Sequence, residues 1–276
     1  MTTSAQRSGA VEVAVLGIGA IGPGLASWAQ AAPLLREPAG WVRSPTVVPP
    51  PQRLPATERR RAGTVVKASI VVADEALAMA GVAASEVATV FTSSTGDPLN
   101  CHLLCEALAT SERMVSPTRF TNSVHNAPAG YWHIAAGSMA PSTSLAAYDA
   151  SFAAGLLEAA VQVQATQAPV LLVACDVPYP EPLHSKRPVA DSFGVALLLG
   201  PTRDAPASAA WLGLACGTGE VAVTACADEA MDRLRREIPA ARALPLLQAL
   251  AGQVPASVVL DDVPGAVLHV QLRWPE

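Results

Sequence analysis

Residues 143–174 read TSLAAYDASFAAGLLEAAVQVQATQAPVLLVA, and this stretch decides the fold class. Residues 143–147 predict a strand, and the alanine-rich residues 150–163 predict a helix that packs through its small side chains. Residues 170–174 form a continuous apolar run, which is typical of a strand buried on both faces. A strand, a helix and a strand in succession indicate an α/β fold.

The same alternation continues on both sides of this stretch. Further strands are predicted at residues 13–16, 87–92, 193–199, 211–215, 220–224 and 267–272. Further helices are predicted within residues 25–35, 57–79, 99–109, 122–136, 228–236 and 240–251, with Thr57 as the N-cap of the second. Because the strands are largely apolar, we expect a sheet covered by helices on both faces.

The composition is unusually apolar for a chain outside a membrane. Hydrophobic residues make up 51% of the 276 residues and charged residues 15%, with a formal net charge of −5. Either the core is large, or another chain covers apolar surface. The acidic balance argues against nucleic acid as a partner. The one basic run, residues 59–61, is either a solvated helix face or a contact for an acidic carrier protein.

Cysteine usage and apolar runs bear on the compartment. The odd count of five cysteines argues against a disulfide scaffold. Residues 1–10 lack the apolar core of a signal peptide, and no apolar run is long enough to span a bilayer. We therefore expect a cytoplasmic protein without an integral membrane segment. Cys101 and Cys105 share a helical face, but no second ligand pair follows, so we expect core residues and no bound metal.

Gly17, Gly19 and Gly22 spell G-x-G-x-x-G directly after the predicted strand at residues 13–16. In a dinucleotide-binding fold such glycines bring the backbone to a pyrophosphate at a helix N-terminus. The acidic residue expected about 20 positions later would be Glu37, which follows no predicted strand. A glycine-rich turn without a cofactor is the favoured interpretation, and an NAD(P)-binding oxidoreductase stays open as an alternative.

Asp149 stands between the predicted strand at residues 143–147 and the helix at residues 150–163. Its carboxylate can cap that helix by accepting a backbone N–H of the first turn. The same corner also has the form of a degenerate nucleophile elbow, where the helix N-terminus favours an anion. Both interpretations can hold together, so the sequence leaves open whether Asp149 lines a cavity or only caps the helix.

Several stretches, in order, resemble the N-terminal half of β-ketoacyl synthases. They are VAVLGIGAIGP at 13–23, EAL at 75–77, VFTSSTGD at 90–97 and APSTSL at 140–145. The sharpest is SPTRFTNSVHNAPAG at 116–130, which resembles β-ketoacyl synthase-like, N-terminal proteins of aryl-polyene and xanthomonadin-type clusters. The resemblance implies a thiolase-like layered fold and a single half-length domain over residues 1–276. Residues 40–56 would be a proline-rich surface excursion and residues 228–276 a family-specific C-terminal extension.

The departures from the family pattern carry the functional expectation. The family's active-site cysteine falls on Asp149, whose acylation would give a labile mixed anhydride in place of a thioester. The family's catalytic histidines stand in His-Gly-Thr and Gly-His motifs, whereas none of the five histidines here adjoins a glycine. The resemblance therefore implies a pseudoenzyme with no catalytic residue, cofactor or metal of its own.

Inactive relatives in this family replace one protomer of a catalytic dimer as chain-length factors. The resemblance implies a full-length catalytic ketosynthase as partner, with an acyl carrier protein as a second candidate. Residues 120–147 are the candidate interface and acyl-tunnel wall. Interface or acyl-pocket candidates are Phe120, Asn122, His125, Asn126, Tyr131, Trp132, Tyr148, Asp149 and Phe152. Ordinary core packing is the alternative role for the aromatic side chains.

One other class of function stays open besides the NAD(P)-binding oxidoreductase. The chain could be an active acyl-transfer or initiation factor that uses Cys175 or Asp149 as its nucleophile. Stable acylation of any residue of the chain would distinguish this class from a non-catalytic subunit.

Overall fold

The computed structural model describes residues 10–219 and 221–275 of the chain. Its strands are β1 Val11–Ile21, β2 Ala88–Thr92, β3 Ser142–Leu145, β4 Val170–Asp176, β5 Phe193–Gly200, β6 Ala210–Thr218, β7 Ala256–Asp261 and β8 Ala266–Arg273. Its α-helices are α1 Trp28–Arg36, α2 Ala56–Arg61, α3 Thr64–Ala80, α4 Pro98–Ala109, α5 Pro117–Thr121, α6 Ala127–Ala136, α7 Ser151–Thr166, α8 Glu229–Glu237 and α9 Leu244–Gly252. Its 3-10 helices are η1 Pro38–Gly40, η2 Ala84–Glu86, η3 Tyr148–Ala150, η4 Thr202–Asp204 and η5 Pro239–Ala243.

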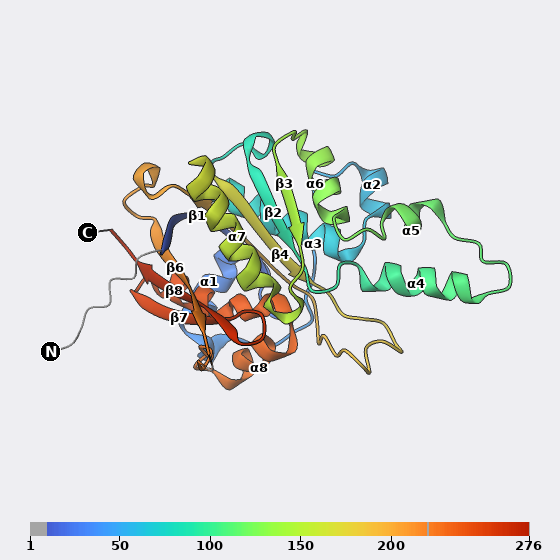
Figure 1. Ribbon diagram of the computed structural model, residues 1–276. Helices are drawn as coiled ribbons and strands as arrows, with labels where there is room; N and C mark the ends of the chain where they lie inside the picture. Colours follow the sequence, from blue (N-terminus) through green and yellow to red (C-terminus); the bar gives the residue numbers. More distant parts are fainter. Residues whose placement is uncertain (1–9, 220, 276) are drawn as a thin grey trace.

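The described strands form one mixed sheet in the order β3-β2-β4-β5-β1-β6-β8-β7 (Figure 1). β2 pairs in parallel with β3 and β4, and the other neighbouring pairs are antiparallel. The strand–helix–strand unit predicted over residues 143–174 is confirmed as β3, α7 and β4. β3 ends the sheet on one side, so its outer edge has no partner strand among the described residues.

The sheet separates two buried clusters of apolar side chains. Successive residues of β4 enter opposite clusters, because side chains alternate along a strand. Leu172 lies with α1, α7, α8 and α9, whereas Leu171 and Cys175 lie with α3 and α6. Helices therefore cover both faces (Figure 1), as the apolar strands predict.

The predicted glycine-rich turn after residue 16 is wrong, because β1 continues through the glycines to Ile21. A Cβ at Gly17 would lie 2.0 Å from the carbonyl oxygen of Ala76, and one at Gly19 would lie 2.0 Å from that of Val72. The glycines thus let α3 pack directly on the strand. They form no loop at a helix N-terminus, so the NAD(P)-binding alternative loses its structural basis.

The helix predicted over residues 57–79 is two helices, α2 and α3, separated at Ala62 and Gly63. Thr57 lies inside α2, and the N-cap position is Pro55 without a side-chain hydrogen bond. The break coincides with a close tertiary contact. A Cβ at Gly63 would lie 2.0 Å from Asp97 Oδ2, so the carboxylate packs against the glycine backbone.

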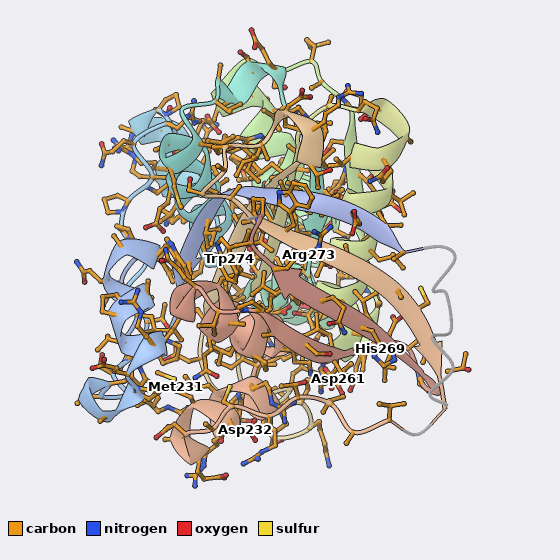
Figure 2. All side chains as sticks on the ribbon, turned by 90° about the vertical axis from the view of Figure 1, so that its left-hand side faces the viewer. Met231, Asp232, Asp261, His269, Arg273 and Trp274 are labelled. Carbon is orange, nitrogen blue, oxygen red and sulfur yellow. The ribbon has the colours of Figure 1, made fainter. Side chains whose placement is uncertain are left out.

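The strand predicted at residues 220–224 is also wrong. β6 ends at Thr218, Gly219 has a positive φ of 98°, and residues 221–224 are irregular. Glu220, like residues 1–9 on which the signal-peptide prediction rests, lies outside the described residues. The eighth strand is instead β7, which forms an antiparallel pair with β8. Figure 2 shows this end of the sheet, with Asp261 on β7 and His269 on β8.

The cysteines are all free, and they differ in exposure. Cys175 and Cys226 are buried, but Cys101 and Cys105 are exposed on α4, so their prediction as core residues is wrong. α4 and α5 stand out from the body of the molecule (Figure 1), which leaves α4 little to pack against. In the part of the chain that the structure describes, no helix has the length and apolarity to cross a membrane.

Candidate functional site

Asp149 lies at the corner between β3 and α7, within η3. The preceding Tyr148 has a φ of 53°, a left-handed conformation that bulky residues rarely adopt. Ser151 Oγ closes the turn, since it accepts the Ala147 N–H at 3.0 Å and donates to the Tyr148 carbonyl at 2.7 Å. The strained strand-to-helix elbow is thus held by its own hydrogen bonds.

The Asp149 carboxylate binds two arginines and does not cap α7. The N-cap residue is Ala150, and no side chain caps the helix there. Arg187 Nη2 donates to Asp149 Oδ1, and Arg242 Nη2 donates to Oδ2 at 3.1 Å. Arg187 comes from the loop between β4 and β5, and Arg242 from η5. The capping interpretation is therefore wrong, and the carboxylate joins three segments of the chain.

Arg187 makes further contacts at the elbow. Its guanidinium lies 3.8 Å from the centroid of the exposed Tyr148 ring, and its Nη2 donates to Ser94 Oγ at 2.7 Å. Burial lowers the pKa of Arg187, but the hydrogen bond and charge of Asp149 outweigh burial, and the net direction is upward. The guanidinium is therefore permanently charged.

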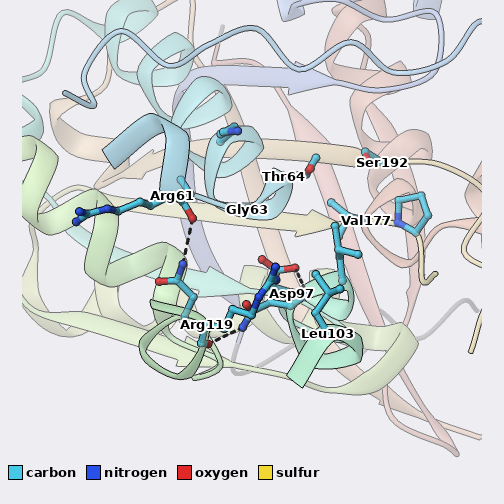
Figure 3. Close-up of a pocket in the computed structure, with 14 residues that line it drawn as sticks. Arg61, Gly63, Thr64, Asp97, Leu103, Arg119, Val177 and Ser192 are labelled. Atoms are coloured by element: carbon cyan, nitrogen blue, oxygen red, sulfur yellow. Dashed lines mark hydrogen bonds between the residues drawn. The ribbon is translucent and has the colours of Figure 1, made fainter. Parts of the chain in front are cut away.

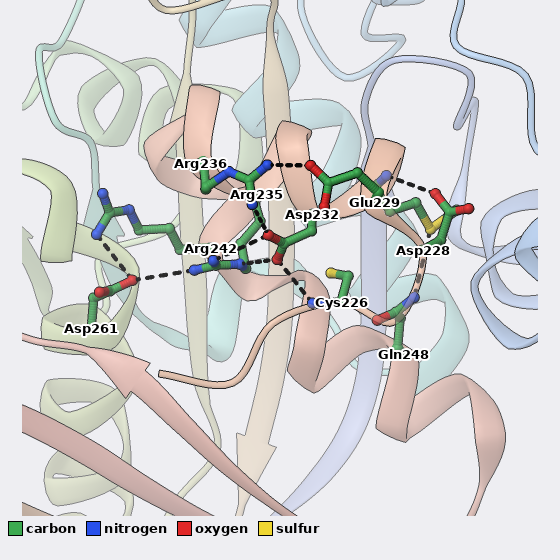
Figure 4. A network of polar contacts seen from close by, with 10 residues as sticks. Cys226, Asp228, Glu229, Asp232, Arg235, Arg236, Arg242, Gln248 and Asp261 are labelled. Atoms are coloured by element: carbon green, nitrogen blue, oxygen red, sulfur yellow. Dashed lines mark hydrogen bonds and ion pairs between the residues drawn. The ribbon is translucent and has the colours of Figure 1, made fainter. Parts of the chain in front are cut away.

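Arg242, which binds Asp149 at the elbow, also belongs to a network of ion pairs in the C-terminal segment (Figure 4). Arg242 Nη1 lies 3.0 Å from Asp261 Oδ2, and Arg235 Nη1 lies 3.7 Å from the same oxygen. Arg235 Nε also pairs with Asp232 at 2.6 Å, and this hydrogen bond lowers the pKa of Asp232. Helix α8, η5 and strand β7 are thus tied electrostatically to the elbow.

Asp176 is a buried acid that the sequence interpretation missed. It is 2% exposed, and its Oδ1 accepts the Ser94 N–H at 2.7 Å and the Ser93 hydroxyl at 3.1 Å. Burial raises its pKa to about 6, although these hydrogen bonds lower it. An acid that closes the apolar run at residues 170–175 was the available signal in the sequence.

Cys175, the neighbour of Asp176, faces the other side of the sheet. It lies in the cluster under α3, away from the elbow. Burial raises the pKa of its thiol to about 12, so almost no thiolate exists near neutral pH. Cys175 is therefore poorly suited to the nucleophile role of the acyl-transfer alternative.

The aromatic candidates differ in burial. Trp132 is 0% exposed and Phe152 is 1% exposed, in clusters on opposite faces of the sheet, so both are core residues. Phe120 on α5 is 70% exposed, and Tyr148 at the elbow is 63% exposed. The fifth aromatic candidate, Tyr131, is half-buried, so Phe120 and Tyr148 are the most accessible to a partner molecule.

The remaining candidates surround the turn between α5 and α6. Buried Asn122 donates from Nδ2 to the Arg61 carbonyl at 3.2 Å and accepts the Tyr131 hydroxyl at 3.1 Å. The ring of His125 places Nε2 at 3.2 Å from the Ser93 carbonyl oxygen. Asn126 is exposed. The turn is therefore fixed both to α2 and to the β2–α4 loop.

An apolar hollow lies between α6 and the segment that leads into α2. The hollow has a volume of about 650 Å³, and Val124, Tyr131 and Ile134 are among its lining residues. Ile134 is 81% exposed and Val124 is 53% exposed. α6 is fixed to the sheet, since His133 Nε2 lies 3.1 Å from Thr89 Oγ1 on β2. Residues 120–147 thus include both the free edge of β3 and exposed apolar side chains on α6 and before it.

A cationic cleft lies between the start of α3 and the α4–α5 pair (Figure 3). It has a volume of about 360 Å³, and Arg61, Lys67 and Arg119 line it. The N-cap of α3 is Gly63, without a side-chain hydrogen bond, so the helix dipole adds positive potential. Asp97 is the one acidic side chain in the lining, and burial raises its pKa.

Comparison with solved structures gives the same fold. The chain is similar to the ketosynthase (ApeO) in complex with its chain length factor (ApeC) from Xenorhabdus doucetiae, with a TM-score of 0.72 and 22% identity over 94% of this chain and 98% of the matched chain. The ishigamide ketosynthase/chain length factor has a TM-score of 0.71 and 16% identity, covering 96% of this chain and 100% of that one. A β-ketoacyl synthase from Burkholderia phymatum STM815 has a TM-score of 0.65 and 11% identity, with the same coverage.

These likenesses confirm the predicted α/β thiolase-like layered fold. No protein of curated function matches the chain significantly. The family model described as β-ketoacyl synthase, N-terminal domain, matches residues 28–257. Because that match covers most of the chain, the protein belongs to the family of β-ketoacyl synthase N-terminal domains.

Proposed function

We propose that the chain is a non-catalytic β-ketoacyl synthase-like subunit that pairs with a full-length ketosynthase in fatty-acid or aryl-polyene-type chain building. The observation that carries the proposal is the elbow, where two arginines hold the Asp149 carboxylate at the position that the resemblance assigns to the family's cysteine. A carboxylate engaged by two guanidinium groups is a weak nucleophile and forms no thioester. The chain then depends on its partner for the condensation chemistry.

The partner surface that we infer is formed by residues 120–147. Two solved relatives are described as ketosynthases with chain length factors, which makes pairing with a ketosynthase the natural proposal here. The free edge of β3 can pair with a strand of a partner, and the exposed Ile134 and Val124 would be covered on association. The high apolar content of the chain agrees with such a covered surface.

The acyl-pocket role is assigned to Phe120 and Tyr148. Both side chains are well exposed; Phe120 belongs to the inferred partner surface, and Tyr148 directly follows it in the chain. An aromatic ring that projects into the partner's acyl cavity would limit the length of chain that fits. Trp132 and Phe152 are left out of this role because they fill the core.

Two further assignments complete the proposal. The cationic cleft with Arg61, Lys67 and Arg119 would receive the acidic surface of an acyl carrier protein, since complementary charge steers such encounters. The complex would work in the cytoplasm, in agreement with five cysteines that are all free.

Co-expression with a full-length ketosynthase encoded by a neighbouring gene tests the pairing. The tagged chain should co-purify with the ketosynthase as a complex of defined size. Ile134→Glu should weaken association by about tenfold or more, because it buries a charge at the interface. Its thermal midpoint should stay within a few degrees of the wild type, since Ile134 is 81% exposed.

Val254→Glu is the matched control, because Val254 is 56% exposed outside residues 120–147. It should leave association unchanged. Association that survives Ile134→Glu would refute the interface. Condensation of two acyl units by the purified chain alone, or stable acylation of Asp149, would refute the non-catalytic assignment.

A further inference from the structure

The donors that surround Asp149 form a compact group. Arg187 Nη2 reaches Oδ1, and Arg242 Nη2 reaches Oδ2 at 3.1 Å, so each oxygen has its own guanidinium. The two arginine side chains are each 22% exposed, and Asp149 is 31% exposed. The Asp149 carboxylate is therefore partly shielded from solvent but still accessible to water.

The guanidinium donors exceed what Asp149 uses. Arg187 Nη2 also donates to Ser94 Oγ at 2.7 Å, and its buried Nε has no hydrogen-bond partner in the described part of the chain. Arg242 Nη1 pairs with Asp261 at 3.0 Å. Asp149 is thus the carboxylate that binds both arginines, whereas Asp261 pairs with Arg242 and Arg235, and Asp176 acts on Arg187 through its charge. Removing the Asp149 carboxylate would leave both guanidinium groups without the anion that they share, in a partly buried place.

We propose that Arg187 and Arg242 form a carboxylate-binding site at the elbow, and that Asp149 fills it as an internal ligand that latches η5 and its neighbours onto the start of α7. The planar forks of two guanidinium groups match the two oxygens of one carboxylate. The site would therefore take a small free monocarboxylate once the internal one is removed. This inference does not depend on the ketosynthase partner.

The latch follows from where the two arginines stand in the chain. Arg242 is 93 residues from Asp149 and Arg187 is 38 residues from it, so the carboxylate closes two long loops. Arg242 also engages Asp261 of β7, and Asp261 lies near Arg235 of α8. Loss of the internal ligand should therefore loosen α8 and η5 as well as the elbow.

Formate rescue of Asp149→Ala in the full-length chain tests the site. Alanine keeps Cβ and removes only the carboxylate, and formate has the matching size. The variant should unfold about 5 °C below the wild type, as expected for loss of a half-buried ion pair in a chain of this size. Formate should raise the midpoint of the variant above that in chloride at equal ionic strength, with the concentration dependence of ligand linkage. The wild type should show no such difference.

A second variant and three controls sharpen the result. Asp149→Gly lacks Cβ as well as the carboxylate, so acetate should raise its thermal midpoint more than formate does. In the double variant Asp149→Ala/Arg187→Gln, formate should no longer raise the thermal midpoint. Asp204→Ala removes an exposed carboxylate that pairs with Arg203, and formate should not raise its midpoint either. Asp149→Asn fills the place with an amide and should be destabilised without rescue. Equal effects of formate and chloride on Asp149→Ala would overturn the site.

Hydrogen exchange measures the latch separately. In Asp149→Ala, backbone amides of α8 and η5 should exchange faster than in the wild type, and formate should slow them again. Amides of α3 lie on the other face of the sheet and serve as the internal reference. Unchanged exchange in α8 and η5 would refute the latch.

Discussion

Cys175 and Asp176 are neighbours in β4, yet they point to opposite faces of the sheet and have different roles. Cys175 packs under α3 as a small apolar residue. Asp176 collects hydrogen bonds from Ser93 and Ser94 and is almost completely buried. The alternation of side chains along a strand thus keeps the one buried thiol of β4 away from the elbow.

Asp176 should give the protein a measurable pH dependence. Burial raises its pKa from 3.8 to about 6, so its contribution to stability is complete below pH 3.8 and is lost as the pH rises through about 6. The loss amounts to about 3 kcal/mol in the free energy of unfolding. The free energy of unfolding of Asp176→Asn, relative to that of the wild type, should therefore increase by up to about 3 kcal/mol between pH 4 and pH 7. Urea unfolding at each pH measures this difference.

The absolute stability of Asp176→Asn is a separate quantity, because the amide accepts fewer hydrogen bonds at every pH. Only the change with pH tests the titration. Asp204→Asn, at an exposed carboxylate, is the matched control for the loss of one acid. If the free energies of unfolding of Asp176→Asn and the wild type changed in parallel with pH, the raised pKa of Asp176 would be contradicted.

At the scale of elements, the contact between β1 and α3 organises one face of the sheet. Gly17 and Gly19 bring the strand against the backbone of the helix, where no side chain fits. The same glycines produced the false dinucleotide motif in the sequence. A G-x-G-x-x-G pattern needs a turn at a helix N-terminus for cofactor binding, and here it lies within a strand.

Gly19→Ala should destabilise the protein by about 3 kcal/mol or more, because its Cβ would lie 2.0 Å from the Val72 carbonyl oxygen and force α3 away. Gly130→Ala is the matched control. Its Cβ would meet nothing within 4 Å, and it lies in α6, so it should be neutral or stabilise by up to about 1 kcal/mol. Chemical denaturation measures both, and similar values for the two variants would rule out close packing as the reason for Gly19.

At the scale of the whole molecule, charge is distributed unevenly over a chain with a net charge of −5. Three cations gather in the cleft at the start of α3. The Arg242 guanidinium, by contrast, is neutralised by Asp149 and Asp261. One region therefore remains available to an acidic partner, while the other is satisfied internally.

The cleft predicts salt-dependent binding of an acyl carrier protein to the assembled complex. Lys67→Glu combined with Arg119→Glu should weaken binding by about tenfold or more, and should flatten its dependence on ionic strength. Arg203→Glu, at a side chain that is 64% exposed outside the cleft, is the matched control and should have little effect. Titration calorimetry at two salt concentrations measures the binding affinity. An equal loss of affinity in both variants would mean that only the net charge of the chain matters, and not the cleft.

The sequence by itself determined most of the strands and helices and their order, because strand and helix periodicities are local properties of the chain. It missed β7 and the break between α2 and α3. The alternation around residues 143–174 placed β3, α7 and β4 correctly, and it located Asp149 at the corner between them. The order of short family-like stretches identified the family, which the model match over residues 28–257 then confirmed.

Only the tertiary structure decided what Asp149 contacts. Its partners Arg187 and Arg242 stand 38 and 93 residues away, and no local spacing predicts which distant arginine meets a carboxylate. The same holds for burial, since Trp132 fills the core while Phe120 lies exposed. Such contacts arise from how the sheet and helices pack, so they become visible only once the chain is folded.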